Sequence, residues 1–99
     1  MEKDKQPLFT IITVCLNSQE TIEATVRSVL DQECKDYEYI IVDGCSSDHT
    51  VRIIKTYEEL FEGRMTIVSE KDKGLYDAMN KGIGMASGRF INFLNSDDS

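Results

Sequence analysis

Short apolar runs alternate with amphipathic stretches along this chain, and that alternation limits the folds open to it. The apolar runs are residues 8–16, 37–42, 65–69 and 90–94. The stretches with apolar side chains at helical spacing are residues 19–32, 51–61 and 75–87. Strand-type and helix-type patterns that alternate across short loops are typical of a parallel sheet with right-handed crossovers. The sequence therefore predicts an α/β fold with the element order βαβαβαβ.

A length of 99 residues is enough for one small domain with a single core. We predict a Rossmann-like three-layer sandwich with a mostly parallel sheet in the strand order 3-2-1-4. Residues 1–7 are interpreted as a polar lead-in and residues 8–99 as one subdomain. Because parallel strands are normally covered on both faces, we expect the apolar strands, including the one that begins at Phe90, to be buried.

Polar side chains follow the predicted strands. Asn17 follows the first strand, Asp43 the second, and Asp97 and Asp98 follow the fourth. In the order 3-2-1-4 these carboxyl ends are neighbours, and open α/β sheets bind ligands outside such ends. Two adjacent carboxylates repel each other, and a hard divalent cation relieves that repulsion. We therefore expect one shared cleft, with a metal held by Asp97 and Asp98.

Each of these residues has a simpler reading. Asp97 and Asp98 could belong to a solvated acidic turn, and Asp43 could be a turn residue before Gly44. Asp48 is interpreted as part of a helix cap. His49 is interpreted as a surface residue.

Charge and composition narrow the function classes. The formal net charge of −7 argues against binding to nucleic acids or anionic membranes. A phosphorylated ligand on so acidic a domain needs a metal between ligand and protein. No glycine-rich turn follows the first strand, which weighs against dinucleotide-binding and P-loop folds. The three cysteines have no metal-like spacing, Cys15 is expected in the core, and a reduced, cytoplasmic location is predicted.

Several motifs resemble family 2 glycosyltransferases, in particular bacterial members that assemble polysaccharides. The matching stretches are residues 10–17, 28–32, 38–50, 69–82 and 92–98. The resemblance covers nearly the whole chain from Leu8 onward. It implies an inverting enzyme of the GT-A type that uses a nucleotide-diphosphate sugar, usually linked to UDP, together with Mg²⁺ or Mn²⁺.

The resemblance also implies roles for individual residues. Leu16, Asn17 and Asp43 correspond to positions that line the nucleotide site, and Asp72 corresponds to a position near the base. Asp97 corresponds to the donor site, and the metal ligand is Asp97 or Asp98. The sequence departs from the family pattern at two positions. Asn95 replaces the first aspartate of the metal motif, and Leu16 replaces an aromatic residue that stacks on the base in many members.

In this family the catalytic base lies downstream of the metal motif, and we expect it beyond Ser99. The chain is therefore interpreted as the donor-binding part of a longer enzyme and is expected to be inactive alone. The whole enzyme would transfer a sugar, with inversion, to a hydroxyl of a glycan or lipid-linked acceptor. It would be cytoplasmic or peripheral at the inner membrane face.

Two other functions are compatible with parts of the sequence pattern. The first is a phosphotransferase or receiver-like domain in which Asp43 accepts a phosphoryl group. The second is a non-catalytic fragment that forms a homodimer through exposed core. Neither a conjugate lysine nor a Thr or Ser at a later strand end is evident in the sequence, which weighs against the receiver reading.

Overall fold

The computed structural model describes residues 7–33, 35–71 and 74–94. The strands are β1 (Phe9–Cys15), β2 (Tyr37–Asp43), β3 (Met65–Ser69) and β4 (Phe90–Phe93). The helices are α1 (Ile22–Leu30), α2 (Thr50–Tyr57), the 3₁₀ helix η2 (Glu58–Phe61) and α3 (Leu75–Met85). The predicted element order is confirmed. The second predicted helix divides into α2 and η2.

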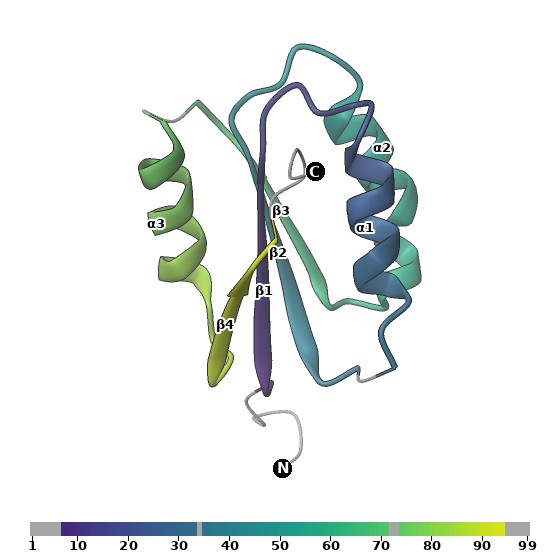
Figure 1. The fold of residues 1–99 in the computed structure, drawn as a ribbon, viewed down its shortest axis with the longest axis vertical. Coiled ribbons are helices and arrows are strands. Elements are labelled where there is room, and N and C mark those ends of the chain that lie inside the picture. The colour runs from purple at the N-terminus through teal and green to yellow at the C-terminus, as the bar shows by residue number, and fades with distance from the viewer. Residues whose placement is uncertain (1–6, 34, 72–73, 95–99) are drawn as a thin grey trace.

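The sheet has the strand order β3-β2-β1-β4, and every adjacent pair is parallel. Figure 1 shows β1 in the interior of this sheet, with α1 and α2 over one face and α3 over the other. The predicted α/β fold, three-layer arrangement and strand order 3-2-1-4 are therefore confirmed. None of the helices in the described ranges is both long and apolar enough to cross a membrane.

The larger core cluster lies between the sheet and the helices α1 and α2. Alternate residues of β1 and β2 point to this side because successive strand residues face opposite ways. Its largest fully buried side chains include Tyr39, Phe61, Ile22, Ile41 and Ile54.

The smaller core cluster lies under α3. It comprises Ile12, Ile40, Val42 and Ala78. Gly82 of α3 allows this helix to approach β1, because a Cβ built on Gly82 would lie 2.7 Å from Cγ2 of Ile12.

The predicted burial of the strand that begins at Phe90 is wrong for the described residues. Phe90 is 55% exposed, Ile91 40% and Phe93 39%. The reason is the position of β4 at the sheet edge, where it pairs with β1, whereas α3 lies over β1 and β2. One aromatic contact secures the strand, between the rings of Phe90 and Phe9 with centroids 5.9 Å apart.

A carboxylate ties the start of β4 to the middle of the sheet. Glu38 of β2 accepts a hydrogen bond from the Thr10 hydroxyl at 2.7 Å and two from the amide and hydroxyl of Ser87. The Gly88 amide donates to Thr10 Oγ1 at 2.8 Å. A Cβ on Gly88 would lie 2.5 Å from the same oxygen, so this approach requires glycine. The contacts hold the connection between α3 and β4 against β1 and β2.

Candidate functional site

The carboxyl ends of β1, β2 and β3 lie level with one another. Cys15 pairs with Asp43, and Asp43 pairs with Ser69. The Gly44 amide continues the ladder by donating to the Cys15 carbonyl at 2.9 Å. β4 is shorter, and after it the Leu94 amide donates to the Ile12 carbonyl at 2.8 Å. The loops that leave these ends therefore meet at one edge of the sheet, as expected from the strand order.

Asp43 is fully buried at this edge, and four donors surround its carboxylate. Oδ2 accepts hydrogen bonds from the Ser46 amide at 2.8 Å and the Ser69 hydroxyl at 2.9 Å. Oδ1 accepts from the Ser46 hydroxyl and from the Cys15 thiol, whose sulfur lies 3.5 Å away. A buried charge is costly unless it is hydrogen-bonded, and here every bond joins Asp43 to another part of the same edge.

Cys15 acts here as a buried hydrogen-bond donor. Burial raises the pKa of the Cys15 thiol, and the negative charge of Asp43 raises it further. The thiol therefore stays protonated and keeps its hydrogen for the carboxylate. The prediction that Cys15 belongs to the core is confirmed, since its side chain is 4% exposed.

Asn17 joins the loop after β1 to the loop after β2. Its backbone N–H donates a hydrogen bond to Ser46 Oγ at 2.8 Å, and its side-chain Oδ1 accepts one from the Ser47 backbone N–H at 2.8 Å. The Asn17 backbone is in the left-handed region with φ of 50°, which asparagine tolerates better than most residues. The side chain and the backbone of Asn17 therefore both serve the same contact.

A second set of contacts closes the same two loops farther from the sheet. The Ser18 backbone N–H donates a hydrogen bond to Thr50 Oγ1 at 2.7 Å, and the Gln19 backbone N–H donates one to Asp48 Oδ2 at 3.3 Å. The His49 amide donates in return to Gln19 Oε1 at 3.1 Å. These bonds join the start of α1 to the start of α2.

Asp48 has the capping role expected of it. Its Oδ1 accepts hydrogen bonds from the amide of Thr50 at 2.9 Å and from the Thr50 hydroxyl at 2.5 Å. Desolvation works against ionisation of Asp48, but the hydrogen bonds from Thr50 and Gln19 outweigh it, so its pKa lies below the ordinary value. The side chain of His49 is exposed, as predicted.

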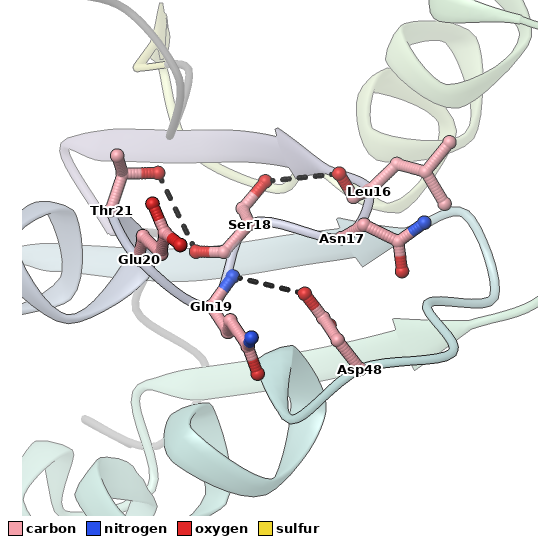
Figure 2. A pocket seen from close by; sticks show the side chains of 7 residues that line it. All are labelled: Leu16, Asn17, Ser18, Gln19, Glu20, Thr21 and Asp48. Carbon is pink, nitrogen blue, oxygen red and sulfur yellow. Dashed lines mark hydrogen bonds between the residues drawn. The ribbon is translucent and has the colours of Figure 1, made fainter.

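A pocket of about 310 Å³ lies on the outer side of the β1–α1 loop. Its lining residues are Leu16, Asn17, Ser18, Gln19, Glu20, Thr21 and Asp48. Figure 2 shows the Leu16 side chain extending away from Glu20 and Asp48, and Leu16 is 58% exposed. The pocket therefore has an apolar corner beside a mainly polar wall.

The loop after β3 starts beside Asp43 and is held by α3. The Glu70 amide donates to the Asp43 carbonyl at 3.0 Å. Lys81 of α3 forms an ion pair with Glu70 at 3.2 Å, and its Nζ also donates to the Lys71 carbonyl at 3.2 Å. A second ion pair joins Lys81 to Asp77 at 3.8 Å. The start of this loop is therefore fixed at the same edge as Asn17 and Asp43.

The structure brings Leu16, Asn17 and Asp43 together at one end of the sheet. The other predicted site residues, Asp72, Asp97 and Asp98, lie outside the described residues, as does Asn95. Across residues 7–33, 35–71 and 74–94, no group of three or more His, Cys, Asp and Glu side chains could hold a metal ion. The predicted metal ligands are therefore not tested by this structure.

Sequence reasoning missed Ser46 and Ser69 as partners of Asp43. The sequence pattern indicates a helix cap at Asp48 and a strand that ends at Ser69, and neither pattern indicates a contact with Asp43. The available signal was the position of Ser69 at a strand end beside a strand that also ends in a carboxylate. The adjacency of β2 and β3 turns that signal into a contact.

Comparison with known proteins supplies independent findings. The family model described as Glycosyl transferase family 2 matches residues 10–99. TuaG of Bacillus subtilis, which is named as a glycosyltransferase for teichuronic acid biosynthesis, is 43% identical over 93 residues. The match covers 94% of this chain and 37% of TuaG.

Solved structures give the same picture. TarS of S. aureus (residues 1–349), determined in complex with UDP-GlcNAc, has a TM-score of 0.83 and 26% identity, covering 91% of this chain and 26% of that one. The mannosyltransferase PcManGT of Pyrobaculum calidifontis, in complex with GDP-Man and Mn²⁺, has a TM-score of 0.83 at 23% identity. It covers 95% of this chain and 28% of that one, and at this identity it supports the fold alone. The chain spans well under half the length of each of these three proteins.

Proposed function

Because the chain belongs to glycosyl transferase family 2, we propose that residues 8–99 form the donor-binding part of a sugar-transferring enzyme. The observation that carries this proposal is the joined pair of loops at the carboxyl ends of β1 and β2. They place Leu16 and Asn17 at an open pocket, at the edge where α/β sheets bind ligands.

The donor that fits best is a nucleotide-diphosphate sugar carrying UDP. The UDP-GlcNAc bound by TarS, which resembles this chain over 91% of its length, supports this assignment. Leu16 offers an exposed apolar side chain to a base, and Asn17 lies next to it. Asp72 is assigned to the base, and Asp97 to the donor site through the metal described next.

Asp97 and Asp98 are proposed to hold Mg²⁺ or Mn²⁺. Support comes from the chemistry of the side chains, since adjacent carboxylates suit hard cations, and from the net charge of −7, which would otherwise repel a diphosphate. When bound, the metal neutralises the charge that develops on the departing nucleoside diphosphate. The chain's own task is to bind and orient the donor.

In the whole enzyme, the acceptor is proposed to be a hydroxyl of a glycan or lipid-linked molecule. Its oxygen attacks the anomeric carbon of the donor sugar with inversion, the nucleoside diphosphate leaves, and a general base takes the hydroxyl proton. No general base is assigned within residues 8–99. We place the enzyme in the cytoplasm or at the inner membrane face, and the free thiols of Cys15 and Cys45 agree with a reducing compartment. The exposed side chains of β4 are proposed to let the isolated chain form homodimers.

The receiver-like alternative is not favoured. Both oxygens of Asp43 accept hydrogen bonds from protein donors, and the residue is fully buried. An incoming phosphoryl group would first have to displace Ser46 or Ser69.

Calorimetry tests the proposal. The chain is titrated with UDP in Mn²⁺, then with UDP in excess chelator, and GDP serves as a comparison nucleotide. We expect UDP to bind in Mn²⁺ and to bind at least tenfold more weakly with chelator, a loss of about 1.4 kcal/mol. Asp97→Asn and Asp98→Asn should reproduce that loss in whichever residue ligates the metal, whereas Glu58→Gln, at an exposed position of η2, should not.

Two results would contradict the proposal. Absence of binding by UDP, UDP-sugars and GDP in Mn²⁺ would remove the donor-binding function. Equal UDP affinity with and without chelator would leave the donor site standing and remove the metal.

A further inference from the structure

We propose that Asp43 is a positioning residue for the nucleotide-sugar site. It orients the hydroxyl of Ser46, and that hydroxyl in turn holds the backbone of Asn17. The three residues form the Asn17–Ser46–Asp43 hydrogen-bond chain, in which each member donates to the next. The inference rests on the proposed function, because it assigns a role within the same donor site.

The first step concerns what Asp43 can reach. Its side chain is fully buried, and each carboxylate oxygen accepts two hydrogen bonds from the protein. A carboxylate has about four lone-pair sites for hydrogen bonds, so these donors leave none for a ligand. Asp43 therefore acts on a bound nucleotide through its neighbours.

The second step concerns the direction of the hydrogen bonds. An ionised carboxylate can only accept, so the single hydrogen of the Ser46 hydroxyl points to Asp43 Oδ1. That orientation turns a lone pair of Ser46 Oγ to the Asn17 amide, which donates to it at 2.8 Å. Bonds to a charged acceptor are stronger than neutral ones, and bonds in a chain polarise one another. The charge of Asp43 thereby fixes the position of the Asn17 backbone N–H, through the Ser46 hydroxyl.

The third step concerns what the Asn17 amide controls. Asn17 has φ of 50°, a backbone conformation that is unfavourable for most residues with a side chain. Two hydrogen bonds hold that conformation. The Asn17 backbone N–H donates to Ser46 Oγ, and the Asn17 side-chain Oδ1 accepts from the Ser47 backbone N–H. Leu16 and Asn17 are adjacent lining residues of the pocket, so the turn at Asn17 sets where both side chains lie. Loss of the Ser46 hydroxyl should therefore disturb the pocket without removing any group that lines it.

Matched variants separate positioning from direct contact. Ser46→Ala removes the hydroxyl and Ser46→Thr retains it. Ser28→Ala in α1 is the control, because its exposed hydroxyl donates to the Thr25 carbonyl, outside the pocket lining. UDP binding in Mn²⁺ is measured by calorimetry, and thermal unfolding is followed in parallel. We expect Ser46→Ala to weaken UDP binding about tenfold, Ser46→Thr to restore most of it, and Ser28→Ala to leave it unchanged.

A double-mutant cycle gives the second test. If Asp43 acts through Ser46, Asp43→Asn with Ser46→Ala should bind UDP no more weakly than the weaker single variant. A large loss in Asp43→Asn beside unchanged binding in Ser46→Ala would show that Asp43 touches the ligand and would overturn the inference. Equally weakened UDP binding in Ser46→Thr and Ser46→Ala would also overturn it, because the hydroxyl would then make no contribution to binding.

Amide exchange provides a readout that needs no variant. In the wild-type chain without UDP, the backbone amide hydrogen of Asn17 should exchange slowly with solvent, although the residue itself is exposed. Exchange at the rate of an unstructured amide would overturn the hydrogen-bond chain even if UDP binds. A wild-type chain that does not bind UDP refutes the proposed function, whereas wild-type affinity in Ser46→Ala refutes this inference alone.

Discussion

Two carboxylates of β2 show how one residue can join distant parts of the chain. Asp43 lies at the carboxyl end of the strand and collects donors from Cys15, Ser46 and Ser69. Glu38 lies near the amino end, on the opposite face, and collects donors from Thr10 and Ser87. Asp43 serves the end where the candidate site lies, whereas Glu38 serves the other end of the sheet.

Glu38 makes stability depend on pH. Desolvation acts to raise the pKa of Glu38, but hydrogen bonds from Thr10, Ser87 and Gly88 outweigh it and lower the pKa. A carboxyl whose pKa is lower in the folded state stabilises the fold above its unfolded pKa, about 4.3 for glutamate, and loses that contribution as pH falls through the folded value.

We therefore expect Glu38→Gln to lower the free energy of unfolding by about 1 kcal/mol at pH 7, the usual size of such hydrogen bonds. The difference from wild type should shrink as pH falls below the ordinary glutamate range. Urea unfolding at several pH values measures both effects, and Glu58→Gln in η2 is the control. A difference that stays constant down to pH 3 would contradict the charge-assisted role.

At the scale of the element, α3 contains two glycines that face different surroundings. A Cβ on Gly82 would lie 2.7 Å from Cγ2 of Ile12, a fully buried residue of β1, whereas a Cβ on Gly84 would meet nothing within 4 Å. Glycine lowers helix stability at both positions. Only at Gly82 does close packing offset that cost.

The pair predicts opposite effects of the same substitution. Gly82→Ala should destabilise the chain by about 1–3 kcal/mol, since overpacking of a filled core costs that much. Gly84→Ala should stabilise it by about 0.5–1 kcal/mol through helix propensity. Urea unfolding of the two variants measures both changes. The same sign in both variants would show that α3 does not pack on Ile12 as described.

The elements also show how far sequence patterns reach. Periodicity predicted every strand and helix, because apolar spacing depends on local geometry. It does not indicate which glycine of α3 packs closely on the sheet, and the structure shows that Gly82 does and Gly84 does not. It wrongly predicted burial of β4, because burial depends on which neighbours cover a strand.

The candidate site likewise has features that the sequence predicts and features that it does not. The grouping of Asn17 with Asp43 followed from strand order, which the alternation of elements implies. The contact of Ser46 with Asp43 could not be predicted, because it depends on the path of the loop after β2. The contact of Ser69 follows only once β2 and β3 are known to pair with level ends. The predicted roles of Asp72, Asp97 and Asp98 stay predictions.

At the scale of the whole molecule, β4 carries exposed apolar side chains at the edge of the sheet. They are Phe90, Ile91 and Phe93. Edge strands with exposed apolar residues readily pair with another copy. Leu60 of η2 is equally exposed at 55% but belongs to another part of the chain.

We expect the isolated chain to associate as its concentration rises in sedimentation experiments. Ile91→Lys should shift the population to monomer because it places a charge on β4, whereas Leu60→Lys should leave association unchanged. Circular dichroism checks that both variants remain folded. A chain that is monomeric at every concentration, or equal effects of the two variants, would contradict association through β4.

The position of β1 between β2 and β4 also bears on synthesis. β1 pairs with β2 early in the chain, but its other partner, β4, leaves the ribosome after every other element described here. Until then the nascent protein carries an open hydrogen-bonding edge on a hydrophobic strand, the kind of surface that chaperones bind and that aggregates form from. Slow translation between α3 and β4 would prolong that exposure, and rapid translation would shorten it.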